Sequence, residues 1–327
     1  MIGRRKFITL LGGAAAAWPL AARAQQAAVP VIGVLHSASP DGFFAQYIAE
    51  FRRGLAEAAY IEGRNITIEY RFAEGQYDRL PALATDLVRR QMAAIFATGT
   101  APSLAARSAT ATIPIVFSIG GDPVRYGLVA SFNKPGGNVT GISQLGNVLY
   151  SKQIGLLHEM RLTTTIALIV NPNNPNAASD ISDAKMAAQT VGQQVIVLNA
   201  STAHDIDTAF ASLLQLRADA LLVATDAFLF DRRDQLVGLA ARYAIPSMFN
   251  TREFAAAGGL MAYAGDLSEG YRLAGIYTGR ILKGEKPADL PVQQVTKMKL
   301  VINLKTAKAL GIEVPPTLLA SADEVIE

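Results

Sequence analysis

The sequence contains no cysteine, and this absence excludes several kinds of site. Without thiols there is no disulfide framework, no thiolate-bound metal, no cysteine nucleophile and no lipid-modified cysteine behind an export signal. Histidine is nearly as scarce, because the chain holds only His36, His158 and His204, which stand far apart and lack the spacing of metal ligands. We therefore expect a protein that holds neither a metal nor a cofactor.

Sequence motifs for phosphate binding and for nucleophilic catalysis are missing as well. The chain has no G-x-x-x-x-G-K-[ST] loop and no G-x-G-x-x-G fingerprint. Its Ser, His and acidic residues form no nucleophile elbow. The sequence thus offers no recognisable chemistry, and we expect a binding protein that is not an enzyme.

Charged residues make up only 17% of the 327 residues, and their balance depends on the N-terminus. Arg4, Arg5 and Lys6 precede an uncharged, Ala- and Leu-rich run, and small residues fit a cleavage site after Ala24. We interpret residues 1–24 as an export signal, by either the general secretory or the twin-arginine route, because the run is too short for a bilayer span. Cleavage removes four of the 30 basic residues and leaves 26 against 27 acidic ones.

The charge balance of the exported chain is almost neutral. It offers no basic face that would attract nucleic acid or an anionic membrane surface. No later stretch is long and apolar enough to span a bilayer, so we expect no stable membrane insertion. Together with the signal, these features predict a soluble protein that works in the periplasm.

From Val29 onward, short β-like runs alternate with longer helical patterns. Alternation of this kind is typical of a parallel, doubly wound sheet. Strands are expected at 31–36, 65–72, 94–97, 113–118 and 139–142, and again at 165–171, 194–198, 220–225, 245–249 and 260–263. Helical patterns lie between them at 43–60, 80–91 and 102–109, and at 177–191, 206–217 and 232–243.

The second series of runs repeats landmarks of the first in the same order. The landmarks are an isolated glycine, an Ile-Pro pair and a Gly-Gly pair: Gly63, Ile113-Pro114 and Gly136-Gly137, then Gly192, Ile245-Pro246 and Gly258-Gly259. This shared order favours a duplication over chance similarity between two α/β segments. We predict two similar lobes, the first formed by 25–142 plus about 265–290 and the second by 143–264 plus about 291–327.

The loops that follow the strands are the place to look for a ligand. In open parallel sheets, ligands bind beyond the carboxyl ends of the strands. Two lobes whose strand ends face each other enclose a cleft at that edge. An exported, two-lobed α/β protein without cofactor motifs is what a solute receptor is expected to look like.

Three long and widely separated stretches carry a resemblance to a known family: residues 62–84 (EGRNITIEYRFAEGQYDRLPALA), 112–143 (TIPIVFSIGGDPVRYGLVASFNKPGGNVTGIS) and 300–327 (LVINLKTAKALGIEVPPTLLASADEVIE). They resemble the substrate-binding proteins of ABC transporters whose known ligands include tryptophan, tyrosine and phenylalanine. The resemblance implies a type I periplasmic-binding-protein fold, a ligand trapped by hinge closure, and an ABC permease in the inner membrane as partner. It does not select one solute.

The first candidate site is the loop at 98–103, which follows a strand and opens a helix. Backbone N–H groups and the helix dipole attract an anion there, and the absence of a lysine favours a carboxylate over a phosphate. If the ligand is an amino acid, we expect its carboxylate to contact Thr98, Gly99, Thr100, Ala101, Ser118 and Gly120. The alternative is an ordinary helix start with Thr100 as its N-cap.

An ammonium group on the ligand requires an acceptor, best supplied by a carboxylate on the facing lobe. Asp226 ends a strand of the second lobe and is the first candidate, followed by Glu253 and Asp122. The alternatives are a helix N-cap for Asp226, a partner of Arg252 for Glu253, and a turn before Pro123 for Asp122.

Aromatic residues gather at the same strand ends and are candidates for sandwiching an apolar or planar side chain: Phe43, Phe44, Phe228, Phe230, Phe249, Phe254 and Tyr263. At least one of Phe228 and Phe230 is expected to face the cleft. Core packing is the alternative, most clearly for Phe249, which ends a buried strand. Asn173 and His36 are further candidates, with turn formation and a purely structural role as their alternatives.

Two other functions stay open at this point. An exported α/β enzyme could use Asp122, Asp226 or Glu253 for acid–base work on a small metabolite. A ligand-sensing module of a membrane receptor would share the same two-lobed fold. The leading hypothesis is the periplasmic receptor, which requires only binding and closure.

Overall fold

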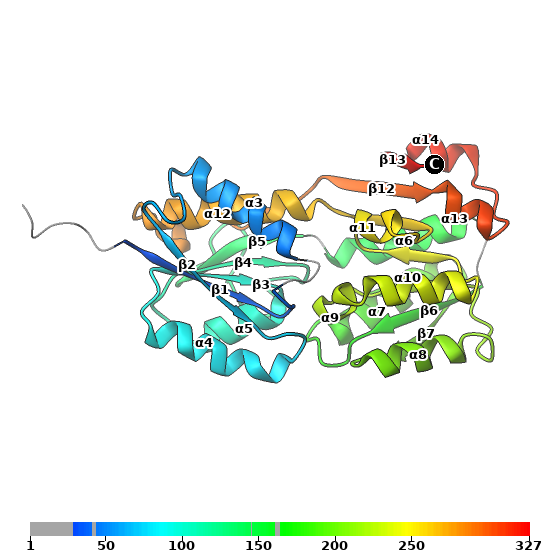
Figure 1. Cartoon of the computed structure of the whole chain (residues 1–327), viewed down its shortest axis with the longest axis horizontal. Helices are drawn as coiled ribbons and strands as arrows, with labels where there is room; N and C mark the ends of the chain where they lie inside the picture. Colours follow the sequence, from blue (N-terminus) through cyan, green and yellow to red (C-terminus); the bar gives the residue numbers. More distant parts are fainter. Residues whose placement is uncertain (1–28, 41–43, 145, 161–163) are drawn as a thin grey trace, which may run out of the picture.

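The computed structural model describes residues 29–40, 44–144, 146–160 and 164–327, and these form two α/β lobes that lie side by side (Figure 1). Each lobe has its own sheet with helices on both faces. The export signal expected at 1–24 lies outside the described residues. This two-lobed, doubly wound architecture agrees with the fold class that the sequence predicts.

The sheet of the first lobe is entirely parallel and has six strands. Their order across the sheet is β2 (Thr67–Phe72), β1 (Val31–His36), β3 (Ala94–Thr98), β4 (Ile115–Ile119), β5 (Val139–Ser143) and β11 (Gln293–Gln294). The three central strands are buried along almost their whole length, because helices cover both faces. Because β11 belongs to this sheet, the first lobe extends past the boundary expected near residue 290.

The sheet of the second lobe has seven strands and one antiparallel pair, β10 with β12. The order is β7 (Gln194–Asn199), β6 (Thr165–Val170), β8 (Ala220–Val223), β9 (Ser247–Phe249), β10 (Met261–Gly265), β12 (Met298–Asn303) and β13 (Glu324–Ile326). Its last two strands come from the C-terminal segment, drawn orange and red in Figure 1.

The first five strands of each lobe follow the same topology. The order β2-β1-β3-β4-β5 recurs as β7-β6-β8-β9-β10. The repeated Ile-Pro pairs are equivalent in detail, since the carbonyl of Pro114 accepts from Ile95 N–H and that of Pro246 accepts from Leu221 N–H, both at 2.8 Å. The repeated glycines Gly63 and Gly192 both have positive φ, at 79° and 72°. The structure therefore confirms the predicted similarity of the two halves, because five strands have the same order in both sheets.

Helices fill the connections between the strands. In the first lobe they are α3 (Ala45–Glu57), the 3-10 turn η1 (Tyr77–Arg79), α4 (Leu80–Arg89), α5 (Thr100–Ala109), α12 (Leu267–Leu282) and η2 (Pro287–Asp289). In the second they are α6 (Gly146–Glu159), α7 (Ala177–Thr190), α8 (Ala203–Ser212), α9 (Ala227–Asp231), α10 (Arg233–Arg242), α11 (Arg252–Ala256), α13 (Leu304–Ala309) and α14 (Pro316–Ser321). The helical patterns named from the sequence include neither the long α6 and α12 nor the short α9, α11, α13 and α14. Five or six residues are too few for a periodic pattern.

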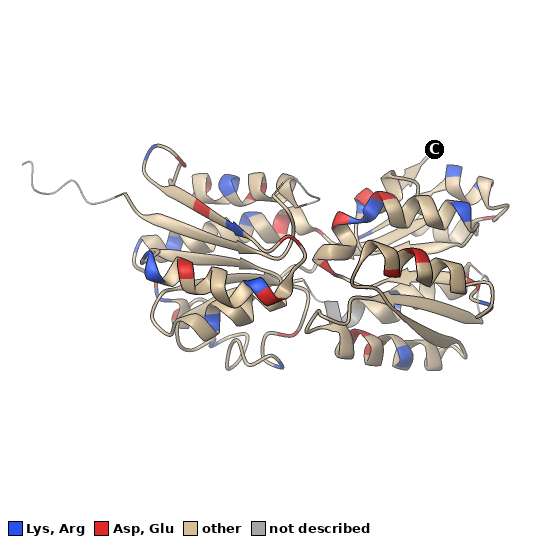
Figure 2. Cartoon of the chain, turned by 60° about the horizontal axis from the view of Figure 1, so that its bottom comes forward, with Lys and Arg blue, Asp and Glu red and all other residues tan. Residues whose placement is uncertain are grey.

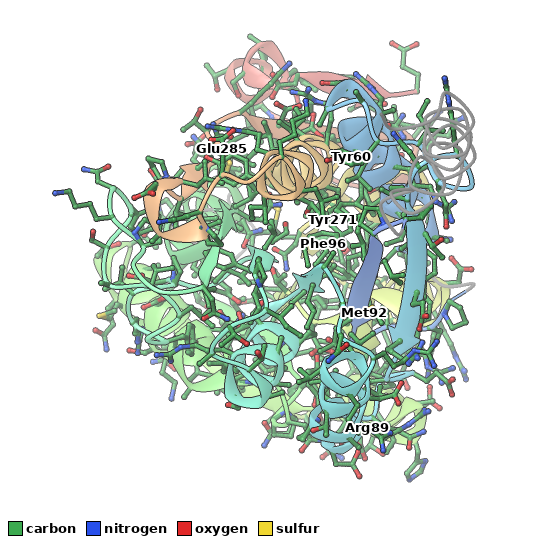
Figure 3. The ribbon with its side chains drawn as sticks, turned by 90° about the vertical axis from the view of Figure 1, so that its left-hand side faces the viewer. Tyr60, Arg89, Met92, Phe96, Tyr271 and Glu285 are labelled. Atoms are coloured by element: carbon green, nitrogen blue, oxygen red, sulfur yellow. The ribbon has the colours of Figure 1, made fainter. Side chains whose placement is uncertain are left out.

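Helix α12 returns from the second lobe and packs on α3, although the two are more than 200 residues apart in sequence (Figure 1). The crossing depends on two glycines. A Cβ added to Gly54 would lie 1.9 Å from the carbonyl oxygen of Arg272, and one added to Gly275 would lie 2.2 Å from that of Phe51. Figure 3 shows Tyr271 of this helix beside Phe96 of β3, with ring centroids 5.5 Å apart in an edge-on contact.

The chain passes between the lobes after β5, after β10, and between β11 and β12. Figure 2 shows both signs of charge interspersed over the outer helices of the two lobes. Among the residues that the structure describes, no helix is long and apolar enough to cross a membrane.

Candidate functional site

The candidate site is a cavity of about 110 Å³ between the lobes, at the carboxyl ends of β1, β3, β4 and β8. A single water needs roughly 10–15 Å³ by this kind of measure, so the space suits a small solute. The lining residues are His36, Ser37, Phe44, Tyr77, Thr98, Gly99, Thr100, Ala101, Ser118, Gly120, Gln144, Leu149, Tyr150, Asn174, Asn176, Asp180, Thr225, Asp226, Ala227, Phe230, Asn250, Ala264, Gly265, Leu267 and Tyr271.

The loop between β3 and α5 forms one wall of this cavity. Gly99, with φ of 94°, precedes the helix in the N-cap position, and its N–H donates to the carbonyl of Ser118 at 2.8 Å. Thr100 is therefore the first helical residue and not the N-cap, and its side chain makes no capping hydrogen bond. The N–H groups of Thr100 and Ala101 open the helix, where no carbonyl lies four residues back to accept from them.

Several buried polar atoms in the cavity wall have no hydrogen-bond partner among the described residues: Thr100 Oγ1, Gln144 Oε1 and Asn176 Oδ1. Thr100 and Asn176 come from opposite lobes and converge beside Gly121. A Cβ placed on that glycine would lie 3.0 Å from Asn176 Oδ1 and 3.2 Å from Thr100 Oγ1. Because a buried polar group without a partner costs free energy, these atoms mark where a polar ligand group is accommodated.

His36 ends β1 in the cavity wall, and burial lowers its pKa from 6.5 to about 3, so the ring is neutral. Its Nδ1 accepts from Ala38 N–H at 2.9 Å, which puts the ring proton on Nε2. Nε2 then donates to the Tyr271 hydroxyl at 3.2 Å. Both ring nitrogens are thus occupied, and His36 orients Tyr271, whose hydroxyl also lies beside Thr98.

Asp226 is buried in the wall contributed by the second lobe and accepts hydrogen bonds from four residues. Oδ1 accepts from Leu229 N–H at 3.0 Å, which caps α9, and from Asn171 Nδ2 at 3.2 Å. Oδ2 accepts from Asn174 Nδ2 at 2.9 Å and from the Tyr77 hydroxyl at 2.5 Å. Burial raises the pKa of this carboxyl, while the donors counteract the rise. Its lone pairs are already used.

Asp180, on α7, is the second carboxylate in the cavity wall. Burial raises its pKa from 3.8 to about 7, the neighbouring Asp183 adds to the rise, and a hydrogen bond from the Tyr150 hydroxyl lowers it. Among the described residues, no Lys or Arg lines the cavity. The carboxyl of Asp180 is thus desolvated without a compensating cation.

Contacts between the lobes surround the cavity. Besides the pair Tyr77–Asp226, the Tyr47 hydroxyl donates to Glu253 Oε1 at 2.9 Å, and Ser39 N–H donates to Asp231 Oδ2 at 3.0 Å. The Tyr126 hydroxyl lies 3.0 Å from Ser179 Oγ and donates to the carbonyl of Pro175 at 3.3 Å. The rings of Phe44 and Phe230 pack across the boundary with centroids 5.6 Å apart. The two lobes are therefore closed on each other.

The structure brings eight of the fourteen candidate residues from the sequence to the cavity wall: His36, Thr98, Gly99, Thr100, Ala101, Ser118, Gly120 and Asp226. Phe230 lines it as well, as expected for one of the pair Phe228 and Phe230. Phe228 instead packs near Gly75 and beneath the Arg232 guanidinium, which lies 5.7 Å from its ring centroid.

The other candidates lie elsewhere for local reasons. Asp122 accepts from Val124 N–H at 2.8 Å and forms the turn that was its alternative. Asn173 is exposed, Phe249 is fully buried and stacked on Phe254, and Tyr263 packs in the core of the second lobe. Glu253 is engaged by Tyr47 at the lobe boundary. None of the five lines the cavity.

The lining residues not named from the sequence come both from helices and from the loops that follow the strands. Gln144 follows β5, Tyr150 lies within α6, Asp180 lies within α7, and Leu267 and Tyr271 belong to α12. A polar side chain inside a helix gives no local signal of facing a ligand. Loops that follow strands, where the sequence predicts ligand contacts, supply a second group: Ser37, Asn174, Asn176, Thr225, Ala227 and Asn250. Within the described residues, no group of metal-ligating side chains occurs.

Known proteins share this fold at moderate sequence identity. The tyrosine-binding protein of Clostridioides difficile (strain R20291) is 28% identical over 265 residues, which are 80% of this chain and 76% of that protein. A domain from Streptococcus pneumonia in complex with L-Trp superposes with a TM-score of 0.83 at 26% identity, covering 91% of this chain and 99% of that one. A conserved domain protein from Vibrio cholerae superposes with a TM-score of 0.82 at 25% identity and the same coverage.

The arrangement of the lobes is also informative. The ligand-free, open structure of a substrate binding protein with adhesive properties from Clostridium difficile is 26% identical, covers 91% of this chain and 99% of that one, and gives a TM-score of only 0.64. The lobes thus sit more like those of the L-Trp complex than like those of the open protein. The sequence profile described as "ABC transporter substrate binding protein" matches residues 31–326. The chain therefore belongs to this family of substrate-binding proteins.

Proposed function

We propose that this chain is the periplasmic receptor of an ABC importer and binds an amino acid with an aromatic or apolar side chain. The observation that carries the proposal is the pairing of Thr100 and Asn176. They come from different lobes, and each has a buried oxygen without a partner among the described residues at one point of the cavity wall. A solute held between them stabilises the closed form, because it contacts both residues only when the lobes meet.

The ligand's carboxylate is assigned to the wall formed by the start of α5. The Thr100 hydroxyl and the N–H groups of Thr100 and Ala101 are uncharged donors at the positive end of a helix. The hydroxyls of Thr98 and Ser118 stand at the ends of the adjacent strands β3 and β4. Uncharged donors suit a monoanion of this size better than a phosphate, which recruits Arg or Lys.

The ligand's side chain is assigned to the apolar part of the wall. Phe44, Leu149, Phe230 and Leu267 line it from both lobes, and an aromatic partner gains roughly 0.5–1.5 kcal/mol beyond the area it buries. The relatives support this class of ligand, because one is named a tyrosine-binding protein and another is a complex with L-Trp.

Export, transport and the absence of catalysis complete the proposal. A signal at 1–24, cleaved after Ala24, would deliver the chain to the periplasm, and the family supports an ABC permease as the partner of the closed form. The three acids considered for an enzyme are engaged otherwise: Asp122 in a turn, Asp226 as a cap and lobe contact, and Glu253 at the lobe boundary. We therefore assign binding without turnover.

The direct test is calorimetric titration of residues 25–327 with a panel of L-amino acids, aromatic acids, phosphate and a sugar. Saturable binding of an aromatic or apolar amino acid at micromolar concentration or below supports the proposal. Mass spectrometry of the recovered ligand checks for turnover, and a chemically altered ligand would favour an enzyme instead. Binding of the sugar or phosphate alone, with no amino acid bound, would contradict the proposed ligand class.

A further inference from the structure

The cavity wall of the second lobe contains two carboxylates among the described residues, Asp180 and Asp226, and they differ in what they can still accept. Asp226 receives hydrogen bonds from Tyr77, Asn171, Asn174 and Leu229, which occupy both of its oxygens. An ammonium group that approached it would have to displace one of these donors. Asp226 therefore caps α9 and joins the two lobes through Tyr77.

Asp180 has the opposite character. The hydrogen bond it receives among the described residues comes from the Tyr150 hydroxyl, and both side chains line the cavity. A carboxylate accepts about four hydrogen bonds, so most of its capacity is open. Among the described residues, the charged groups that act on it are acidic: Asp183 on its own helix and Asp226 on the neighbouring loop. A bound cation would therefore stabilise the ionised form of Asp180.

The position of Asp180 relative to the carboxylate wall fits a single small zwitterion. Asn176 and Asp180 are one turn apart, with Asp180 N–H donating to the carbonyl of Asn176 at 2.9 Å, so both side chains lie on one face of α7. Side chains at this spacing are roughly 5–6 Å apart. Asn176 Oδ1 and Thr100 Oγ1 both border Gly121, where an added Cβ would lie 3.0 and 3.2 Å from them. Thr100, Asn176 and Asp180 all line the cavity, which lets the carboxylate of one small zwitterion contact Thr100 while its ammonium group faces Asp180.

We propose that Asp180, oriented by Tyr150, is the ammonium subsite of this receptor and makes it select α-amino acids over the corresponding acids without the amine. The inference rests on the proposed function, since it presupposes a carboxylate held at Thr100. It replaces Asp226, the acceptor favoured by the sequence, with a helical residue that the sequence does not single out. Where the carboxyl of Asp180 is protonated in the ligand-free protein, binding of the ammonium group releases that proton to solvent.

The test compares two ligand pairs in calorimetric titrations of residues 25–327. The pairs are L-tyrosine with 3-(4-hydroxyphenyl)propionate and L-tryptophan with 3-(indol-3-yl)propionate. The wild type should prefer each amino acid, and Asp180→Asn should weaken its binding about 30-fold or more while the amine-free acid changes less than about threefold. Asp183→Asn, on the same helix but outside the cavity wall, is the matched control and should keep the preference.

A pH series provides an independent readout. Burial holds the pKa of Asp180 near 7, so the amino-acid affinity should fall by about tenfold per pH unit below that value, while the amine-free acid keeps its affinity. Tyr150→Phe removes the donor that lowers this pKa, and the pH at which the amino-acid affinity falls should move upward. This variant keeps the test decisive if Asp180→Asn does not fold.

The outcomes separate the inference from the proposed function. If the wild type binds the amine-free acids as tightly as the amino acids, or if Asp180→Asn keeps the preference, the ammonium subsite is wrong and the carboxylate site stands. An unchanged pH midpoint in Tyr150→Phe also overturns the subsite. If the wild type binds neither member of either pair, the proposed function fails and the inference fails with it.

Discussion

The Tyr77 hydroxyl of the first lobe donates to Asp226 Oδ2 of the second at 2.5 Å, and both residues line the cavity. This bond exists only when the lobes are closed, and the carboxylate that receives it is buried. Tyr77→Phe should shift the equilibrium toward the open form and weaken ligand binding by about 3–10-fold, the effect of roughly 1 kcal/mol. Titration calorimetry and small-angle scattering of the ligand-free protein provide the measurement.

The control for that substitution is Tyr70→Phe, which removes a hydroxyl that meets only Arg52 on the outer surface of the first lobe among the described residues. It should leave both the affinity and the radius of gyration unchanged. If Tyr77→Phe behaves like Tyr70→Phe, the bond does not contribute to closure.

The Thr98–Thr100 wall should be important for affinity and unimportant for stability. Thr100 makes no capping bond, so the double variant Thr98→Val with Thr100→Ala removes two hydroxyls without removing a helix cap. We expect at least a tenfold loss of ligand affinity and a change of less than about 1 kcal/mol in the free energy of unfolding. Thr85→Val, on an exposed face of α4, is the control. A collapse of the melting temperature with unchanged affinity would make the wall purely structural.

His36 should make the folded chain sensitive to acid. Its pKa is about 3 in the fold and 6.5 as the ordinary value, so the unfolded chain binds a proton first as the pH falls. The stability that neutral His36 contributes is complete above about pH 6.5 and is lost toward pH 3, by roughly 2 kcal/mol at pH 5. In urea titrations, His36→Asn should flatten this slope, whereas the exposed His204→Asn should keep it.

Asp180 should give a slope of the opposite sign in the ligand-free protein. Its pKa is raised to about 7, so the fold holds a proton that the unfolded chain releases near 3.8, and stability decreases as the pH rises between these values. Asp180→Asn should therefore stabilise the ligand-free chain by about 4 kcal/mol at pH 8 and by less than about 1 kcal/mol at pH 4. Equal effects at both pH values would show that the carboxyl is not desolvated.

Two glycine-to-alanine substitutions, one in the contact between α3 and α12 and one in α6, should change the free energy of unfolding in opposite directions. Gly275→Ala would force a Cβ to within 2.2 Å of a backbone oxygen. We expect the free energy of unfolding to fall by about 3 kcal/mol or more, the upper end of the range for overpacked cores. Gly155→Ala, in α6, meets nothing within 4 Å and should stabilise the protein by about 0.5–1 kcal/mol. Denaturant unfolding of the two variants tests both, and equal effects would contradict the tight crossing.

The fold could be predicted from the sequence because its information is local and repeated. Buried parallel strands read as short β-branched runs, and the glycines and Ile-Pro pairs stand at equivalent places in both halves. The first lobe expected from the sequence already includes the segment of α12, but the contact of this helix with α3 depends on Gly54 and Gly275, which meet α12 and α3 only in three dimensions. Periodicity alone does not reveal which helix a glycine faces.

The site was predictable where residues follow strands and not where they lie within helices. Thr98, Thr100 and Ser118 stand at strand ends, so the sheet topology brings them together. Asp226 stands at such an end too, but its role depends on how many donors surround it, and Asn171, Asn174 and Tyr77 are near only in the closed fold. Asp180 lies in the first turns of a helix, where an acidic residue usually needs no further explanation.

The return of α12 to the first lobe also sets an order for folding. The helix closes one face of the first sheet, and β11 adds its last strand, yet both follow the five repeated strands of the second lobe in the chain. A growing or translocating chain therefore cannot complete its N-terminal half until Gln294 has emerged. The lobe that begins first is finished late, and premature release of a truncated chain would leave α3 without the helix that covers it.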